Sequence, residues 1–291
     1  MTGRRIGVIG GSGLYRIDGL TDIEWRQGES AFGEPSDALC FGRLGGVDVV
    51  FLPRHGRNHH LPPGEINYRA NIDALKRAGV TDILSLSAVG GLQERYAPGT
   101  FVLIDQFIDR TVARVSSFFG TGCVAHVSMA HPVCRRLGDA LEEAGHAVGG
   151  PLLRGGTYVA MEGPQFSSFA ESQLYRNWGA AVIGMTNLPE AKLAREAEIC
   201  YATVAMVTDY DCWHPDHDHV TVDAVIRVLN DNAHRARALV QGVVPLLAHV
   251  EGACPAGCDR ALDYAVLTPP AGRDAALVER LRAVAGRVLD R

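Results

Sequence analysis

Apolar residues in this chain gather into short runs that stop at small, polar or charged residues. The longest run covers 199–211 and is rich in β-branched and aromatic residues, so we expect a strand rather than a helix. Because this run is apolar almost throughout, the strand is expected to be buried on both faces of a parallel or mixed sheet. Shorter runs predict further strands at 6–9, 47–52, 83–88, 101–104, 157–162 and 181–185.

Helical patterns lie between these runs. Residues 68–78 form an amphipathic pattern that stops at Gly79, and 132–144 form another, with Gly145 as its expected end. Further helices are expected at 168–178, 190–197, 220–249 and 274–289, whereas 110–125 is interpreted as a mobile loop. The alternation of strands and helices predicts an α/β fold. Because no repeat or linker divides the chain, we expect one domain with a C-terminal extension.

Composition narrows the classes of function. The chain has 291 residues, of which 47% are hydrophobic and 21% charged, as in an ordinary globular core. Its net charge of −5 disfavours nucleic acid as a partner. No apolar run approaches the ~20 residues that span a bilayer, and the N-terminus turns into glycines before a secretory core develops.

The seven cysteines are odd in number and scattered, which is typical of reduced thiols and predicts a cytoplasmic protein. Cys254 and Cys258 are separated by three residues, but no second pair with similar spacing exists along the chain. We therefore prefer a surface loop to a zinc site at this position.

The central apolar run ends at two carboxylates, Asp209 and Asp211. Ligands in α/β sheets bind beyond the carboxyl ends of the strands, and these acids fall at such an end. In an extended chain, side chains two residues apart leave the same face, so we expect both acids to point the same way. A pair of solvated turn acids is the alternative.

Three other expected strand ends carry groups that bind anions. The first strand runs into a glycine-rich turn that contains Ser12, and a tight structural turn is the alternative interpretation there. Arg54 and His55 follow the second strand, and Arg54 has a planar fork suited to phosphate oxygens. Ser85 and Ser87 lie at the end of the third. Because groups that bind anions recur at three expected strand ends, the sequence predicts that they form one anion site.

A metal is not expected. His55, His59 and His60 are close in sequence, but no cysteine or carboxylate completes a recognisable ligand set. The histidines and aspartates at 214–219 also fit no zinc spacing, so we interpret them as a polar loop near the mouth of a site.

Eight segments in order resemble the methylthioadenosine phosphorylase branch of the trimeric purine nucleoside phosphorylases. In chain order they are IGVIGGSGLY, FGEPSDAL, PRHGRNH, INYRANIDALK, SAVGGL, IDQFIDRT, MEGPQFSSFAES and AREAEICYATVAMVTDYDCW. The resemblance implies a mixed twisted sheet flanked by helices. We expect residues 1–250 to form a nucleoside phosphorylase domain and 251–291 to form an extension packed on it. The chain after about residue 246 lies outside the matching segments, so the extension is an expectation from the absence of a dividing linker. The resemblance also implies a homotrimer or a dimer of trimers, with active sites near subunit interfaces.

The resemblance implies the phosphorolysis of a purine nucleoside, with phosphate as co-substrate and no cofactor or metal. Ser12 and Ser87 stand where many relatives carry threonine, and the hydroxyl is retained. The positions that match phosphate ligands of the family are Ser12, Arg54, His55, Ser87, Ala88 and Thr186.

At the base, the resemblance implies that Asp209 protonates the leaving purine and that Asp211 accepts from a 6-amino group. Oxopurine enzymes of the superfamily carry asparagine instead, so the pair favours adenine. Phe166 and Ser167 match base-pocket positions. Residues expected near the ribose and its 5′ substituent are Met185, Val222, Val225 and, from a neighbouring subunit, His126.

The function implied is the cleavage of S-methyl-5′-thioadenosine by phosphate to adenine and 5-methylthioribose 1-phosphate. Three alternatives stay open at this point. Two of them change the substrate, to a 5′-halogenated 5′-deoxyadenosine or to a 6-oxopurine nucleoside. In the third, the chain is a nucleoside-binding module without turnover.

Overall fold

The computed structural model describes residues 4–11, 13–215, 222–248 and 252–290, and within 222–230 it describes only the backbone, apart from the side chain of residue 228. A mixed, 11-stranded sheet forms the centre of the molecule. Its strands are β1 (Arg5–Gly10), β2 (Leu20–Arg26), β3 (Leu39–Leu44), β4 (Val47–Pro53), β5 (Asp82–Gly91), β6 (Phe101–Leu103), β7 (Gln106–Arg110), β8 (Leu152–Arg154), β9 (Thr157–Met161), β10 (Val182–Gly184) and β11 (Cys200–Asp209).

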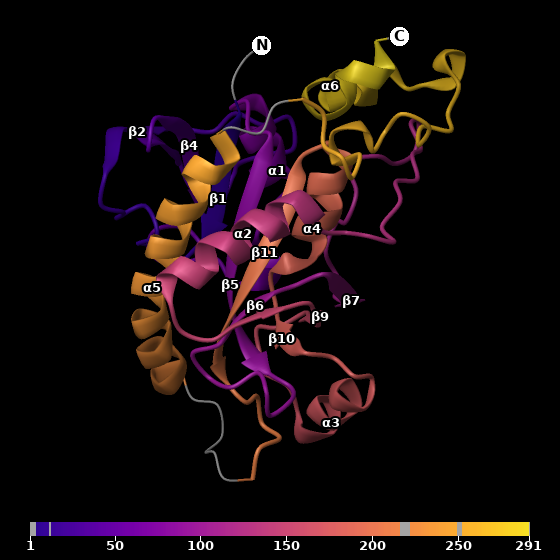
Figure 1. Ribbon diagram of the computed structural model, residues 1–291. Helices are drawn as coiled ribbons and strands as arrows, with labels where there is room; N and C mark the ends of the chain where they lie inside the picture. Colours follow the sequence, from indigo (N-terminus) through magenta and orange to yellow (C-terminus); the bar gives the residue numbers. More distant parts are fainter. Residues whose placement is uncertain (1–3, 12, 216–221, 249–251, 291) are drawn as a thin grey trace.

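Helices lie on both faces of this sheet, so the predicted single-domain α/β fold is confirmed (Figure 1). The described α-helices are α1 (Tyr68–Arg77), α2 (Arg135–Val148), α3 (Phe169–Asn177), α4 (Asn187–Glu196), α5 (Val222–Ala248) and α6 (Ala275–Leu289). Among the described helices, none is both long and apolar enough to cross a bilayer.

Strand β5 is the branch point of the sheet. The strand order is β2-β3-β4-β1-β5-β10-β9-β7, and β11 pairs with β5 and β6 outside this path. Along most of its length β5 lies parallel to β1 and β11, and its last residues pair antiparallel with β10. In Figure 1, β5 and β11 run down together toward the end of the molecule that carries α3. The ends of strands far apart in sequence therefore meet at one edge.

Alternating side chains on β11 explain why its sequence is apolar almost throughout. Tyr201 and Ala205 pack in the core beneath α1 and α4, whereas Ala202 and Val204 pack in the core beneath α2 and α5. Every residue from Cys200 to Thr208 is buried. The prediction of a strand covered on both faces is thus confirmed.

Some predictions from the sequence are wrong. Gly145 does not end α2, which continues to Val148; a Cβ at Gly145 would lie 2.5 Å from Leu152 Cδ2, so this glycine permits close packing. The strands β2, β3, β7 and β8 were not predicted; β2 is mostly exposed and its sequence lacks an apolar run. Cys254 and Cys258 are not in a surface loop, because both are buried.

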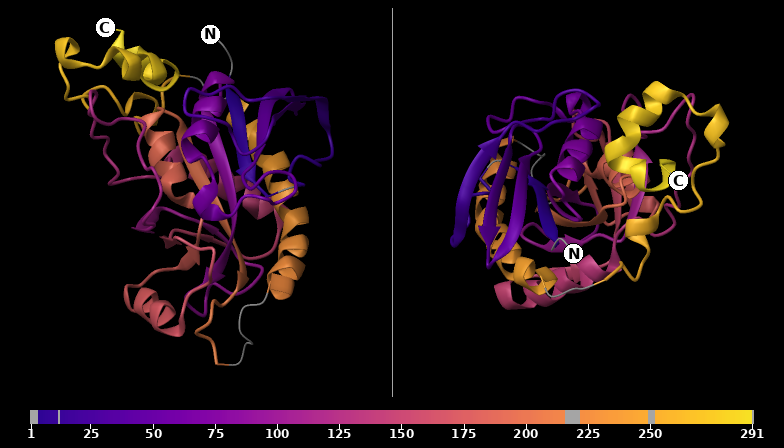
Figure 2. Two further views of the ribbon diagram at one scale, coloured as in Figure 1. Left: turned by 180° about the vertical axis from the view of Figure 1, so that it is seen from behind. Right: turned by 90° about the horizontal axis from the view of Figure 1, so that it is seen from above.

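The chain after α5 lies against the domain (Figure 2). Glu198 is one of its attachments: its carboxylate accepts from the Leu262 backbone N–H at 2.9 Å and pairs with Arg287 of α6. Glu198 is 6% exposed, so its charge is compensated inside the fold. Residue Val266 pairs as an isolated bridge with Ala125.

We expect Arg287→Met to lower the free energy of unfolding by about 2 kcal/mol, because it leaves a buried carboxylate without its cation. Limited proteolysis should then cut the chain after α5 sooner than in the parent. Arg282→Met on the same helix is the control, since Arg282 is 57% exposed and pairs with exposed Glu279. Equal stability of the two variants would contradict the attachment through Glu198.

Candidate active site

The carboxyl ends of β1, β4, β5 and β11 bring together most of the described residues predicted from the sequence. The end of β4 is fixed to that of β1, because the Arg54 backbone N–H donates to the Gly10 carbonyl at 2.9 Å. Strands β5 and β11 are in parallel register, with Ser87 beside Ala205 and Ala88 beside Met206. The candidate site is therefore built on the central strands rather than on a single loop.

Arg54 is buried in an ion pair with Glu190 of α4. Its Nε lies 2.8 Å from Glu190 Oε2 and its Nη2 lies 3.1 Å from Oε1, the two-pronged geometry that arginine forms with carboxylates. Both side chains are 2% exposed. Burial lowers the pKa of Arg54, but the Glu190 carboxylate offsets this effect and holds that pKa above its ordinary value.

Further acceptors surround the Arg54 guanidinium. Nη2 also donates to Ser85 Oγ at 2.7 Å, and Nη1 donates to the Leu86 carbonyl at 3.0 Å. Together with Glu190, these acceptors engage all but one of the five N–H groups of arginine. Arg54 thus offers one Nη1 hydrogen to a ligand among the described contacts, which is fewer than a two-pronged phosphate contact requires.

The Arg54–Glu190 pair belongs to a larger buried network. Tyr201 Oη donates to Glu190 Oε1 at 2.9 Å, and Ser85 Oγ lies 2.7 Å from the same oxygen. Asn187 Nδ2 lies 2.6 Å from Tyr201 Oη and 2.9 Å from Thr203 Oγ1. The network joins the end of β4 to β5, α4 and β11 beneath the candidate site.

Three hydroxyl groups gather beside this network. Ser87 Oγ lies 3.2 Å from Thr186 Oγ1 and 3.4 Å from Tyr158 Oη, and the Thr186 backbone N–H points at Tyr158 Oη at 3.4 Å. Ser87 and Thr186, predicted as phosphate ligands, are separated by 99 positions in the chain. Hydroxyls and amides of this kind are donors for phosphate oxygens.

His55 is held in one tautomer. Its Nδ1 lies 2.8 Å from the Leu61 carbonyl, which can only accept, so Nδ1 carries the proton. Burial lowers the pKa of His55 to about 4, and the ring stacks on His59 at 4.4 Å between centroids. At neutral pH its Nε2 is therefore an acceptor, and it can bind a protonated phosphate oxygen but not a bare one.

Asp209 is the last residue of β11. Its Oδ2 accepts from Thr208 Oγ1 at 2.7 Å and its Oδ1 accepts from the Asp211 backbone N–H at 2.8 Å. Burial raises the pKa of Asp209, although these two donors oppose the shift. The carboxyl group is thereby both fixed in position and able to hold a proton at higher pH than a surface aspartate.

Asp211 is oriented by a turn rather than by the strand. Its φ is +52°, so the chain is not extended there and the expectation that both acids follow strand alternation is wrong. Burial raises the pKa of Asp211 to about 6, although the Ser172 and Ser167 hydroxyls beside its carboxyl group oppose the shift. Its Oδ2 is buried, and no hydrogen bond of good geometry reaches it from the described residues. An orphaned oxygen of this kind points to a ligand that supplies a donor.

Gly90 of β5 allows both acids to approach the sheet. A Cβ at this position would lie 2.9 Å from Asp209 Oδ1 and 3.2 Å from the Cβ of Asp211. The register of β11 against β5 also shifts between Val207 and Asp209, which lets Asp209 lie beside Gly90. The acids are consequently positioned by main-chain geometry.

The predicted base and ribose residues lie on neighbouring loops. The Ser167 carbonyl accepts from Cys212 Sγ at 3.4 Å, which joins the loop after β9 to the Asp211 turn. Phe166 on the same loop is 47% exposed. Met185 follows β10, directly before Thr186.

Four predicted residues are not brought into this group by the described structure. Ser12 lies outside the described residues, as do the side chains of Val222 and Val225 and most of the polar stretch 214–219. His126 is exposed in the loop after β7, and its backbone N–H donates to the Ala265 carbonyl at 2.9 Å. Its role at a neighbouring subunit stays a prediction.

Comparison with known proteins decides the family. Residues 5–245 match the Phosphorylase superfamily. The chain belongs to this superfamily. The match covers the strands and helices that carry every described residue of the candidate site, whereas the segment that contains Cys254 and Cys258 lies beyond it.

Individual phosphorylases are similar over almost the whole chain. The chain is 61% identical to the S-methyl-5′-thioadenosine phosphorylase of Cereibacter sphaeroides, covering 98% of both chains. It is 62% identical to that of Rhodospirillum rubrum, covering 98% of this chain and 97% of the relative.

Two solved structures show the same fold. A methylthioadenosine phosphorylase from an antarctic soil metagenomic library has a TM-score of 0.92 at 47% identity, covering 98% of this chain and 99% of the other. The methylthioadenosine phosphorylase of Schistosoma mansoni in complex with adenine has a TM-score of 0.79 at 37% identity, covering 85% and 93%.

Arg114 is a residue of this phosphorylase site that the sequence did not reveal. Its side chain is 2% exposed, and it donates to the Met185, Leu188 and Glu162 carbonyls and, at 3.1 Å, to Tyr68 Oη. It therefore ties the loop after β9 to the loop after β10. It lies in the segment interpreted as a mobile loop, where no periodic pattern indicates burial.

The pKa of Asp211 leads to a testable dependence of stability on pH. The folded pKa of about 6 lies above the ordinary aspartate value of 3.8, so between these values the folded state binds more protons than the unfolded state. Protonated Asp211 therefore makes a contribution to the free energy of unfolding that is fully present below about pH 4 and is lost as the pH rises through about 6. Asp211→Asn, which has no charge to bury, should therefore be more stable than the parent at pH 7.5, by up to about 3 kcal/mol.

Urea unfolding at pH 7.5 and pH 4.5 measures this difference. The difference in the free energy of unfolding between Asp211→Asn and the parent should be smaller at the lower pH. Asp18→Asn serves as the control, because Asp18 is exposed. A gap independent of pH would show that Asp211 is not destabilised by burial of its charge.

Proposed function

We propose that this phosphorylase cleaves S-methyl-5′-thioadenosine with inorganic phosphate, giving adenine and 5-methylthioribose 1-phosphate. The observation that carries the proposal is the pair of buried acids at the end of β11, with an unpartnered Asp211 oxygen and a raised pKa on both carboxyls. Close similarity to enzymes named for this activity supports the choice of substrate.

Phosphate is proposed to bind among Ser12, Arg54, His55, Ser87, Ala88 and Thr186. The hydroxyls of Ser87 and Thr186 and the remaining Arg54 N–H supply donors, while His55 Nε2 accepts from a protonated phosphate oxygen. A phosphate oxygen then attacks the anomeric carbon as the glycosidic bond breaks. The bonding electrons pass to the purine.

The purine requires a proton as it leaves. Asp209 is proposed to donate that proton to N7, and burial supports this role by raising the pKa of its carboxyl. Asp211, when ionised, accepts from the 6-amino group through its unpartnered oxygen. A 6-oxopurine would present an acceptor to the same carboxylate, so adenine is the proposed base. Phe166 and Ser167 complete this pocket.

The 5′ end is proposed to lie against Val222, Val225 and Met185, with His126 from a neighbouring subunit. The valine side chain cannot form a hydrogen bond with a 5′-hydroxyl. It can bury a methylthio group, which contributes roughly 25 cal/mol of binding free energy per Å² of apolar area. Exposed apolar side chains in the loop after β7, which carries His126, and in the chain after α5 support an interface between copies, here a homotrimer or a dimer of trimers. They are Val112, Val115, Val124, Tyr264 and Leu267. We also propose a cytoplasmic location, in keeping with seven free thiols.

Steady-state kinetics with purified enzyme tests the proposed reaction. Adenine release from S-methyl-5′-thioadenosine should require phosphate and saturate with it, and kcat/KM should exceed that for adenosine by about tenfold or more. Turnover without phosphate would contradict phosphorolysis, and binding without turnover would indicate a nucleoside-binding module. Preference for a 6-oxopurine or a 5′-halogenated substrate would instead replace the proposed base or 5′ group.

Asp209→Asn tests the proton donor. The amide has nearly the shape of the acid but cannot transfer its proton, so kcat should fall by about a hundredfold or more. Circular dichroism and thermal unfolding should show that the variant stays folded. A rate close to that of the parent would remove Asp209 from the catalytic group.

A further inference from the structure

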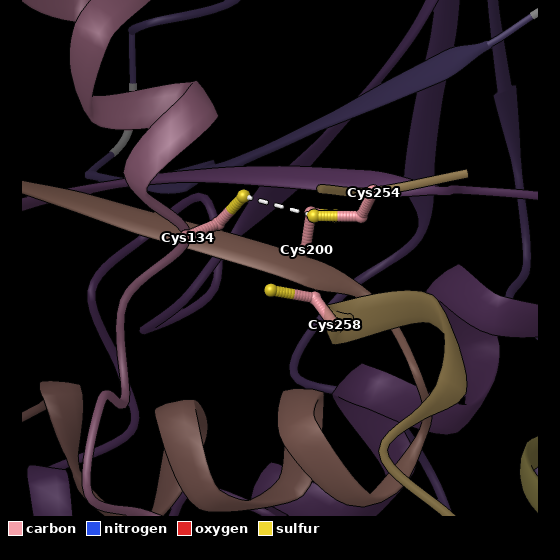
Figure 3. A group of neighbouring side chains, drawn as sticks. All are labelled: Cys134, Cys200, Cys254 and Cys258. Carbon is pink, nitrogen blue, oxygen red and sulfur yellow. Dashed lines mark hydrogen bonds between the residues drawn. The ribbon is translucent and has the colours of Figure 1, made fainter. Parts of the chain in front are cut away.

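Four buried cysteines from three separate parts of the chain converge near the start of β11 (Figure 3). Cys134 directly precedes α2, Cys200 begins β11, and Cys254 and Cys258 follow α5. No spacing along the chain indicates a second cysteine pair, and the fold supplies one from Cys134 and Cys200, which are 66 positions apart. The proposed phosphorolysis uses none of these thiols.

The arrangement has the dimensions of a tetrahedral metal site. All four sulfur atoms lie within 4.8 Å of one another, and Cys134 Sγ lies 3.6 Å from Cys254 Sγ. Four sulfurs around Zn²⁺, at bonds of about 2.3 Å, are separated by about 3.8 Å. A cluster with a separate iron for each thiolate would hold the sulfurs farther apart. The geometry therefore favours a single ion.

The segment 254–258 is folded into a compact turn that presents both of its thiols. The Gly257 N–H donates to the Cys254 carbonyl at 2.8 Å, and Gly257 has a φ of +68°. The Cys254 N–H in turn donates to Asp259 Oδ2 at 2.9 Å. The three-residue spacer falls within the range that structural zinc sites use.

Positive charge is available to balance thiolates. Arg136 is 10% exposed and pairs with Asp82, yet its Nε and Nη1 are buried with no hydrogen-bond partner among the described residues. The same guanidinium lies against the Cys200 thiol. Four thiolates and one Zn²⁺ carry two negative charges, and buried N–H groups of an arginine are suitable donors to them.

We propose that Cys134, Cys200, Cys254 and Cys258 bind a structural Zn²⁺ ion that fastens the chain after α5 to α2 and β11. Binding converts the four thiols to thiolates and releases their protons to solvent, with no oxidation or reduction. With all four positions filled by protein sulfur, the ion has no open position for chemistry. The residues that follow this segment contact the rest of the fold: Leu262 contacts Glu198, Ala265 contacts His126, and Val266 pairs with Ala125. By fastening this segment, the ion also fixes the base of the loop that carries His126.

Metal analysis of the untagged enzyme tests the proposal. After dialysis against buffer with a weak chelator, the parent should retain about one zinc ion per chain. The zinc content of Cys258→Ser should be at least tenfold lower than that of the parent. Cys40→Ser, which changes a buried cysteine outside the group, should keep the zinc content of the parent. A parent without zinc, or a Cys258→Ser variant with full zinc, would overturn the proposal.

Cobalt exchange in the parent enzyme provides a test that needs no variant. Co²⁺ in place of zinc should give intense sulfur-to-cobalt charge-transfer bands and the visible bands of tetrahedral coordination, and a strong chelator should lower the thermal midpoint. Bands typical of nitrogen and oxygen ligands would contradict the cysteine assignment. Thiol titration in denaturant completes the test: a metal-free enzyme with all seven thiols, or one with fewer because disulfides have formed, would also overturn it.

Discussion

The buried ion pair between Arg54 and Glu190 is the interaction on which the candidate site depends. Removing two charges from water costs several kcal/mol per ion, and the pair is tolerated only because its geometry and its other hydrogen bonds are good. Here Ser85, Tyr201 and the Leu86 carbonyl complete the bonding. An apolar pair would fill the same space without this cost, so we interpret the charges as a means of orienting the phosphate end of the site.

The two ends of the site use burial in opposite ways. At the phosphate end, burial keeps His55 neutral although its hydrogen bond to the Leu61 carbonyl opposes this effect, and the charge of Arg54 is balanced by Glu190. At the base end, burial raises the pKa values of Asp209 and Asp211, so each carboxyl group holds its proton up to a higher pH than an exposed aspartate does. Because β5 contributes Ser87 to one end and Gly90 to the other, the separation of the two ends is set by a single strand.

The sequence revealed features that follow from local patterns. The apolar run of β11 predicts a doubly covered strand, and the donors after β4 and on β5 predict that these strands contribute to one anion site. Glu190 escaped prediction because nothing in a helical segment marks an acid as buried. The conformation of Asp211 and the burial of Arg114 depend on contacts with segments distant in sequence. The grouping of Cys134 and Cys200 with Cys254 and Cys258 escaped for the same reason, since spacing along the chain describes only the last two.

A double-mutant cycle of Arg54→Met and Glu190→Leu tests whether the buried ion pair orients the phosphate end of the site. Urea unfolding and phosphorolysis kinetics would be measured for the parent, each single variant and the double variant. We expect each single variant to lose about 3–5 kcal/mol, since each leaves a buried charge alone, and the double variant to lose less than either. The double variant should nevertheless remain at least about a hundredfold below the parent in kcat/KM for phosphate, a deficit of about 2.7 kcal/mol. Additive losses of stability would show that the two charges do not compensate each other, and a stable double variant with full activity would show that the pair does not orient the phosphate end.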